Sequence, residues 1–593
     1  MYSKAQETNI IVEKEAEKST ESSVHHEESL PGPLDPYEED GPTKLNLQTI
    51  LAFLSLCGQF NAYVMTLLIP SSTLSYINAD LGPDPNYTWI TVSWQLGASI
   101  IISVGGRLAD IFGRRYFMLF GSCLGVVGCI VGATGQSINQ MIASGIIFGI
   151  ASGFQEMCYA CIQEILPNKY RMAGVGAFDV TLLIAAFTPL ISYAFIAHSA
   201  ITWRAAYWYM TALHIFFLVI LFFFYNPPDF GMKHRHDGKT KLQLLAELDY
   251  VGVFLFATSS TLFLVGINFG GRQFPWKSTA VIAPIVIGLF CAVLLGFWET
   301  KMHLKYPLLP PKLFKNVRGF VMVIVVCFVG GMLYYSMNVL WPRQSATLFV
   351  PATEPILRGM YATIFSLGSF TGGLIMLFFC SRVGHEKWQL VGFMIAQTAL
   401  IGSLASVGID SKAQAIATVY LASCMITPPQ LISFTMLSLG LDDQTDIGIA
   451  VGLAGTFRLM GGAVATAIYT AILTQKFNDS IVDEIRAVVA QTGLPQSSMN
   501  ALVAAAKLNT AAAYTKVPGI SAAATAASQM AYKLAYVQAF KLVYLVAIGF
   551  GGIATIAAFC TVSTDKAMKN NTRAVVLKNE VNAAEVDETG KKV

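Results

Sequence analysis

Three ionisable side chains, Glu156, Asp179 and Arg458, lie inside long apolar stretches of the chain. Carrying a charged group into the hydrocarbon of a membrane costs about 3 kcal/mol on insertion scales, so such residues are candidates for function. A buried carboxyl group could take up and release a proton, and a guanidinium could balance its charge. Two structural alternatives stay open: Arg458 simply pairs with one of the acids, or both acids face a vestibule on the cytoplasmic side.

Neutral polar and aromatic side chains gather at a similar depth in these stretches: Gln59, Asn61, Tyr63, Trp94, Gln95 and Gln430. Flat apolar rings beside a few amide groups would suit a large, amphipathic, mostly uncharged solute. The same amides could instead form hydrogen bonds between helices, worth about 0.6 kcal/mol each. The sequence does not choose between a substrate pathway and helix packing.

No pattern in the sequence predicts catalysis, a bound metal or a cofactor. A Ser/His/Asp arrangement and a phosphate-binding Gly-rich loop are both missing, and His234 and His236 have no further metal ligands nearby. The ten cysteines all fall in apolar stretches, so no disulfide framework is predicted. There is no basic face for nucleic acid. These features favour a secondary transporter over an ATP-driven pump or an enzyme.

The elements that must position these residues are membrane-spanning helices. Of the 593 residues, 54% are hydrophobic and 13% are charged, with a mean hydropathy of +0.55; soluble proteins carry about 25% charged residues. A span needs about 20 apolar residues. We predict an all-α polytopic membrane protein with fourteen spans at 48–69, 89–108, 116–134, 140–163, 173–196, 205–225, 249–267, 279–299, 318–341, 358–380, 389–408, 413–438, 446–474 and 539–562.

Basic residues predict the orientation of these spans, because Lys and Arg concentrate in alternate loops. Those loops and both termini are therefore expected in the cytoplasm. The sequons at Asn86 and Asn478 then lie outside, where both could be glycosylated. Snorkelling to the interface explains five ionisable residues at span ends: Glu164, Asp249, Glu299, Arg343 and Arg358.

Two terminal segments and one loop lie outside the spans. Residues 1–44 are polar and acidic and are predicted to be a disordered cytoplasmic tail. Residues 563–593 are predicted to be a second cytoplasmic tail. The longest outer loop, 475–538, is Ala-rich, and we expect one or two surface helices there with a break at Pro518-Gly519.

A short charged loop separates the second and third predicted spans, from Gly105 to Arg115. Gly106 permits close helix approach, and Gly113 permits a turn that a Cβ would oppose. Asp110 could pair with a basic group or cap a neighbouring helix, and the cytoplasmic leaflet would hold Arg114 and Arg115. The pattern Gly-x-Leu-Ala-Asp-x-x-Gly-Arg-Arg resembles the loop between the second and third helices of the major facilitator superfamily.

Further motifs extend the resemblance over about residues 45–562, to fourteen-span drug:proton antiporters and most of all to the fungal trichothecene efflux pump family. They are Trp89-Ile90-Thr91, Trp94-Gln95-Leu96, Pro167-Asn168-Lys169-Tyr170-Arg171, Trp203-Arg204, Asp249-Tyr250-Val251-Gly252 and Arg458-x-x-Gly461-Gly462. The resemblance implies two six-helix bundles (45–225 and 301–562), two linking spans in 226–300, and a substrate site between the bundles. It also implies that Asp110, Gly113 and Arg114 help to latch the cytoplasmic side.

The chain departs from the antiporter pattern where that pattern carries charge. Asn61 occupies the position of an acid in the first span, and Gly145 occupies the position of an arginine in the fourth. The fifth-span motif Gly-Pro-x-x-Gly-Gly reads Thr188-Pro189-x-x-Ser192-Tyr193. We therefore expect any proton coupling at Glu156 and Asp179, with Arg458 as their charge partner.

The leading functional hypothesis is a monomeric plasma-membrane transporter that exports hydrophobic toxins or xenobiotics. Its partners would be a small hydrophobic substrate, protons as the coupling ion, and the lipid bilayer. A siderophore–iron importer shares the same architecture and would use the large outer loop. A non-transporting membrane sensor is the alternative of another class.

Overall fold

The computed structural model describes residues 47–227, 240–271, 273–302, 304–351, 353–441, 446–492 and 494–569. These residues contain fourteen helical segments long and apolar enough to cross a membrane, which confirms the predicted number of spans. The tail at 1–44, the pair His234 and His236, and most of 563–593 lie outside the described residues.

The first six spans pack together as an N-terminal bundle. Its helices are α2 (Leu47–Asp80), α3 (Trp89–Phe112), α4 (Arg114–Ala133), α5 (Ile138–Gln155) with α6 (Cys158–Ile165), α7 (Asn168–Val180) with α8 (Leu183–Ala186) and α9 (Thr188–His198), and α10 (Arg204–Phe224). Helix α2 is buried without interruption from Ser55 to Pro70, because neighbours cover all of its faces there.

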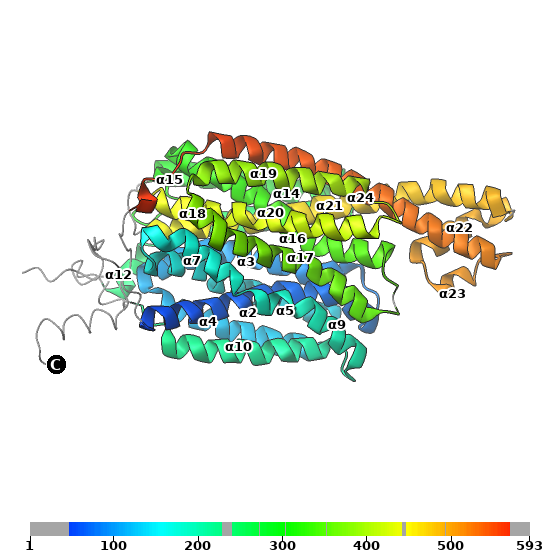
Figure 1. Ribbon diagram of the computed structural model, residues 1–593, viewed down its shortest axis with the longest axis horizontal. Helices are drawn as coiled ribbons and strands as arrows, with labels where there is room; N and C mark the ends of the chain where they lie inside the picture. Colours follow the sequence, from blue (N-terminus) through cyan, green and yellow to red (C-terminus); the bar gives the residue numbers. More distant parts are fainter. Residues whose placement is uncertain are drawn as a thin grey trace, which may run out of the picture.

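The last six spans form a C-terminal bundle of the same size. Its helices are α16 (Met322–Leu348), α17 (Pro355–Ile375) with the turns η3 (Met376–Cys380) and α18 (Ser381–Val383), α19 (Glu386–Ser403), α20 (Lys412–Leu439), α21 (Ile447–Thr492) and α24 (Ala522–Cys560). The two bundles lie side by side with their helices roughly parallel to the long axis of the molecule (Figure 1).

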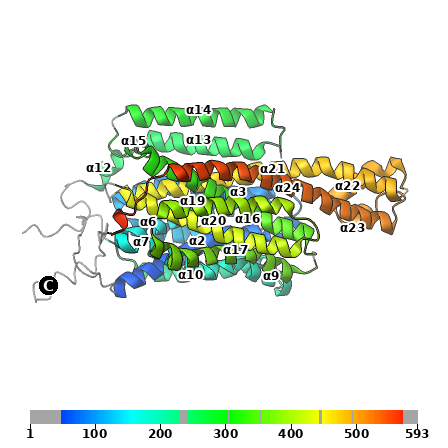
Figure 2. The ribbon, with the colours of Figure 1, turned by 45° about the horizontal axis from the view of Figure 1, so that its top comes forward.

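Two linking helices, α13 (Tyr250–Phe269) and α14 (Thr279–Lys301), pack against each other outside the bundles. Figure 2 shows them along one side of the molecule, where α13 contacts α3 and α21. Most of α14 faces outward, as expected of an apolar helix that borders lipid. The predicted arrangement of two six-helix bundles with two linking helices is confirmed.

The fourth and fifth spans are interrupted, although the sequence predicts continuous helices at 140–163 and 173–196. In the fifth span, Pro189 has no N–H to donate to the carbonyl of Ala185, and the Thr188 hydroxyl donates to that oxygen instead, at 2.6 Å. The Asn61 amide bridges the break, since its Nδ2 donates to Thr181 O (3.1 Å) and its Oδ1 accepts from Ala185 N (3.1 Å). Side-chain hydrogen bonds thus replace backbone ones inside the bundle.

Helices α21 and α24 run well past the ends of the other spans and form a projecting hairpin, which we define as residues 475–538 (Figure 1). The sequence predicts an outer loop with one or two surface helices there. Helices are present, but they extend the spans themselves, because α21 continues to Thr492 and α24 begins at Ala522. The physical reason is that the two helices pack against each other beyond the spans, where Ile481 and Ile485 of α21 and Ala531 and Ala535 of α24 are buried. Short helices α22 (Met499–Leu508) and α23 (Ala511–Tyr514) close the hairpin, and Gly519 has a positive φ before α24.

Candidate functional site

The loop between α3 and α4 marks one end of the molecule, which we call the motif end. Gly113 has φ +95°, so the predicted turn is confirmed. Arg114 is buried and pairs with the carboxylate of Glu164, so a protein acid and not the leaflet holds it. The same contact corrects the snorkelling interpretation of Glu164. Asp249 and Glu299 do not snorkel either, because both are buried and accept hydrogen bonds from backbone N–H groups. Arg115 donates to Phe222 O at 2.7 Å. Asp110 lies in the last turn of α3, and the structure does not describe its side chain.

The two bundles touch along a seam at the motif end. Ser103 and Thr456 share a hydrogen bond of 2.7 Å between their hydroxyl oxygens. Arg171 of α7 is fully buried and donates to Ser438 O of α20 at 3.4 Å. Gly106 faces Gly448. The approach is not tight, because a Cβ added to Gly106 would lie 3.6 Å from Gly448 O, which is an ordinary van der Waals contact. These contacts close the motif end.

Gly176 lies at a tight point of this seam, because a Cβ added to it would lie 2.7 Å from the backbone nitrogen of Leu377. Overpacking of this kind costs about 1–3 kcal/mol, and each 1.4 kcal/mol changes a population about tenfold. We therefore expect Gly176→Ala to disfavour the closed motif end and to lower transport about tenfold at equal protein level. The matched control is Gly392→Ala, where a Cβ meets no described heavy atom within 4 Å. Equal rates in both variants would contradict the assignment.

A charged cluster joins the bundles at the centre of the molecule. Arg458 of α21 lies 3.6 Å from Glu156, which follows α5 at the interruption of the fourth span. The guanidinium carbon lies 5.4 Å from the ring centroids of Tyr334 and Tyr335, and 5.7 Å from that of Phe434. Aromatic faces stabilise a cation that water cannot reach. Arg458 is therefore held by one acid of the opposite bundle and by rings of its own bundle.

Asp179 of α7 shares a small cavity with Arg458. The cavity has a volume of about 20 Å³, enough for about one water molecule. Asp179 Oδ2 and both carboxylate oxygens of Glu156 are buried without a hydrogen-bond partner among the described residues. The structure thus brings the three ionisable residues singled out in the sequence to one place between the bundles.

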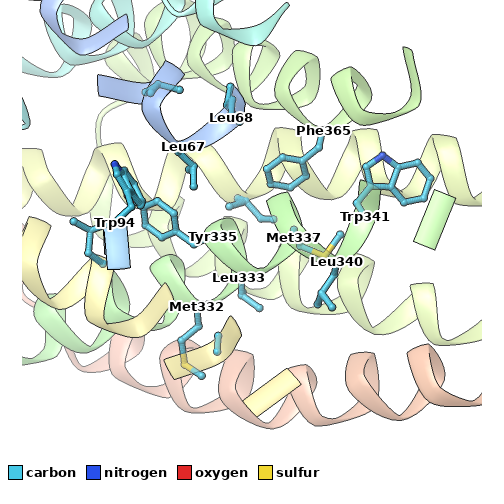
Figure 3. Close-up of a cluster of buried hydrophobic side chains, with 14 of the residues drawn as sticks. Leu67, Leu68, Trp94, Met332, Leu333, Tyr335, Met337, Leu340, Trp341 and Phe365 are labelled. Carbon is cyan, nitrogen blue, oxygen red and sulfur yellow. The ribbon is translucent and has the colours of Figure 1, made fainter. Parts of the chain in front are cut away.

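Two of the predicted substrate-pathway residues, Tyr63 and Gln430, line this cavity. The Tyr63 hydroxyl lies 3.0 Å from the hydroxyl of Tyr335, which closes the cavity between the bundles. Trp94 lies behind them and does not line the cavity. Its Nε1 donates to Thr66 and Ser152 at 2.9 Å each. Its ring centroid lies 6.2 Å from that of Tyr335, and Figure 3 shows the two side chains next to each other.

The other predicted pathway residues are buried in the N-terminal bundle away from the cavity. Gln59 donates to Phe217 O at 2.9 Å and accepts from Ser122. Asn61 bridges the break in the fifth span, and Gln95 is buried in α3. In this conformation Gln59 and Asn61 form hydrogen bonds between helices, which is the alternative to a substrate pathway that the sequence left open. The aromatic wall of Tyr159, Tyr334 and Tyr335 was missed, although tyrosines at the depth of Arg458 were a usable signal.

Gly145, the position of the missing arginine, packs α5 tightly against α3. A Cβ there would lie 2.4 Å from Ile90 O and 2.5 Å from Ser93 Oγ, so an arginine has no room. The departure from the antiporter pattern is therefore built into the packing of these two helices.

A much larger hollow lies at the opposite end, which we call the hairpin end. It has a volume of about 690 Å³ and is lined by α2, α3, α16, α17, α21 and α24. Both predicted sequons belong to this half of the molecule. Asn86 lies in the turn η1 (Pro85–Thr88). Asn478 lies within α21, and Ser480 of its sequon is buried and donates to Gln538 at 3.0 Å.

Several known transporters resemble this chain over most of its length. The family model described as fungal trichothecene efflux pump matches residues 46–588. A trichothecene efflux pump of Fusarium sporotrichioides is 26% identical over 517 residues, covering 86% of this chain and 85% of that protein. An MFS-type transporter of Penicillium rubens is 27% identical, covering 94% and 98%. A trichothecene efflux pump of Trichoderma arundinaceum is 26% identical, covering 87% of each chain.

Proposed function

Because this chain belongs to the fungal trichothecene efflux pump family of major facilitator transporters, we propose that it exports hydrophobic metabolites or xenobiotics by proton-coupled alternating access. It is a multi-pass membrane transporter and not an enzyme. The observation that carries the proposal is the buried Glu156–Arg458 pair, which joins opposite bundles beside an aromatic-lined cavity.

Protonation of this pair provides a way to couple protons to movement of the bundles. An ionised Glu156 attracts Arg458 strongly, because both charges are removed from water. A proton on Glu156 removes that attraction and frees Arg458 to interact with Asp179, which lines the same cavity. The bundles can then separate at one end and close at the other around the substrate. Glu156 and Asp179 are the proposed proton carriers, and Arg458 is their counter-charge.

The environment of Asn61 supports coupling at these acids and not at the usual position. Its amide both donates to Thr181 O and accepts from Ala185 N. A carboxylate in its place could still accept from Ala185 N but would leave the Thr181 carbonyl without this donor. The neutral Asn61 therefore suits the interrupted fifth span, and Glu156 and Asp179 are the residues that take up and release the proton.

We further propose that the motif end and both termini face the cytoplasm of a plasma-membrane monomer. The basic loop residues support this orientation. With the motif end closed and the 690 Å³ hollow at the hairpin end, the structure then corresponds to an outward-facing arrangement. Asp110, Gly113 and Arg114 would latch the cytoplasmic side, and Asn86 would be the more accessible of the two sequons.

Accumulation in a fungal host without its own efflux pumps and siderophore importers tests the proposal. Cells expressing the chain are expected to hold less of a labelled trichothecene-like toxin, and a protonophore is expected to restore its level. A rise in labelled ferric siderophore would instead indicate import, which the projecting hairpin beside the hollow would suit. Binding of either solute with no transport of both would favour a sensor.

A further inference from the structure

We propose that the hollow at the hairpin end is a binding site for an amphipathic organic anion, such as a carboxylate on an apolar body. This inference rests on the proposed function and deepens it, because it names organic acids among the solutes that the transporter handles. It concerns a site separate from the central cavity of Arg458.

The charges that line the hollow all have the same sign. Its described ionisable residues include Arg343 of α16, Arg358 of α17 and Lys533 of α24, and no carboxylate lines it. Among the described residues, none of these three cations has a carboxylate oxygen within 4 Å. Cations in a hollow with low-dielectric walls focus a positive potential that attracts anions.

Protein contacts orient Arg343 without neutralising it. Its guanidinium donates to the Tyr536 hydroxyl at 3.2 Å and lies 5.7 Å from the centroid of that ring. Tyr536 stacks on Phe477 with a centroid distance of 4.2 Å. The base of the projecting hairpin therefore fixes the position of this charge.

Arg358 and Lys533 add charge from two other helices. Arg358 donates to the carbonyl oxygens of Ala346 and Val350, at 3.3 and 3.2 Å, where α16 ends. These neutral acceptors leave its net charge in place. Lys533 belongs to the hairpin part of α24 and is partly exposed. The three cations come from different helices and meet only around this hollow.

The remaining wall suits an amphipathic body, because apolar and aromatic side chains alternate there with Ser and Thr hydroxyl groups. Tyr87, Tyr193, Leu74 and Val339 line the same hollow, and its volume of about 690 Å³ lies in the range of sites for drug-sized ligands, roughly 300–1,000 Å³. The hollow lies between the two bundles, so a solute on the transport route can reach it. A lipid headgroup would require a site on the outer, lipid-facing side.

Binding to the purified full-length protein tests the proposal without transport. The probes are 11-(dansylamino)undecanoate and its methyl ester, added to protein in phosphatidylcholine nanodiscs, with empty nanodiscs subtracted. We expect the acid to bind at least about tenfold more tightly than the ester, and added salt to weaken binding of the acid alone.

Charge variants locate the site. Arg343→Gln and Lys533→Gln are each expected to weaken binding of the acid about tenfold and to leave the ester unchanged. If loss of the Arg343–Tyr536 contact prevents the Arg343 variant from folding, the Lys533 variant still tests the proposal. Lys507→Gln removes an exposed charge from the same hairpin and should change neither probe.

Three results would overturn the proposal: equal binding of acid and ester, unchanged acid binding in the Lys533 variant, or displacement of the acid by phosphatidylglycerol in the nanodisc. The last would assign the cations to a lipid headgroup. Because no transport is measured here, failure of toxin export in the accumulation assay would be a separate result.

Discussion

Arg458→Gln is expected to abolish export while the protein still reaches the membrane. The structure places this guanidinium against Glu156 of the opposite bundle and among three aromatic rings. Removing one partner of a buried ion pair costs about 3–5 kcal/mol, which the remaining carboxyl reduces by taking up a proton. A Glu156 that stays protonated no longer responds to the proton gradient. We expect transport to fall at least about a hundredfold.

Two further variants make this prediction specific. Arg458→Lys keeps the charge but loses the planar group that lies against the rings, so we expect it to restore only a small part of the rate. Arg486→Gln removes an exposed arginine of the same helix, which pairs with Asp483 at 2.9 Å, and should transport normally. Rates within twofold of wild type for Arg458→Gln, measured in proteoliposomes at equal protein content, would exclude the central role.

Glu156→Gln is expected to remove most of the pH dependence of transport. A glutamine resembles the protonated carboxyl at every pH, so the ionic attraction to Arg458 is absent throughout the cycle. Exchange of substrate across the membrane should continue, but a proton gradient should no longer drive net export. Asp179→Asn is expected to weaken the coupling less, because the ion pair between the bundles remains.

Substrate exchange and gradient-driven export in proteoliposomes at several internal and external pH values separate these effects. Asp410→Asn, an exposed acid between α19 and α20, serves as the matched control and should retain the wild-type pH profile. If the Glu156 and Asp179 variants both keep that profile, proton coupling does not occur at these acids.

The sequence determined the number of spans and the turn at Gly113, because both depend on local properties. The length of an apolar stretch is set by the thickness of the bilayer, and a positive φ at a tight turn favours glycine. The sequence also singled out Glu156, Asp179 and Arg458, because charge inside an apolar stretch is costly wherever the chain folds.

Only the tertiary structure decided which polar residues face the cavity. Neighbours bury α2 on all sides, so its sequence shows no polar face that separates Tyr63, which lines the cavity, from Gln59, which packs inside one bundle. The extension of α21 and α24 into a hairpin likewise depends on mutual packing of the two helices beyond the spans.

The clearest difference between sequence and structure concerns Arg343 and Arg358. Their positions at span ends predict snorkelling, and sequence spacing contains nothing about what lies opposite them. The fold places them with Lys533 around one hollow between the bundles. The sequence by itself determined which residues carry charge in or near the membrane. The packing of distant helices decided which charges meet, because electrostatic interactions act through space and not along the chain.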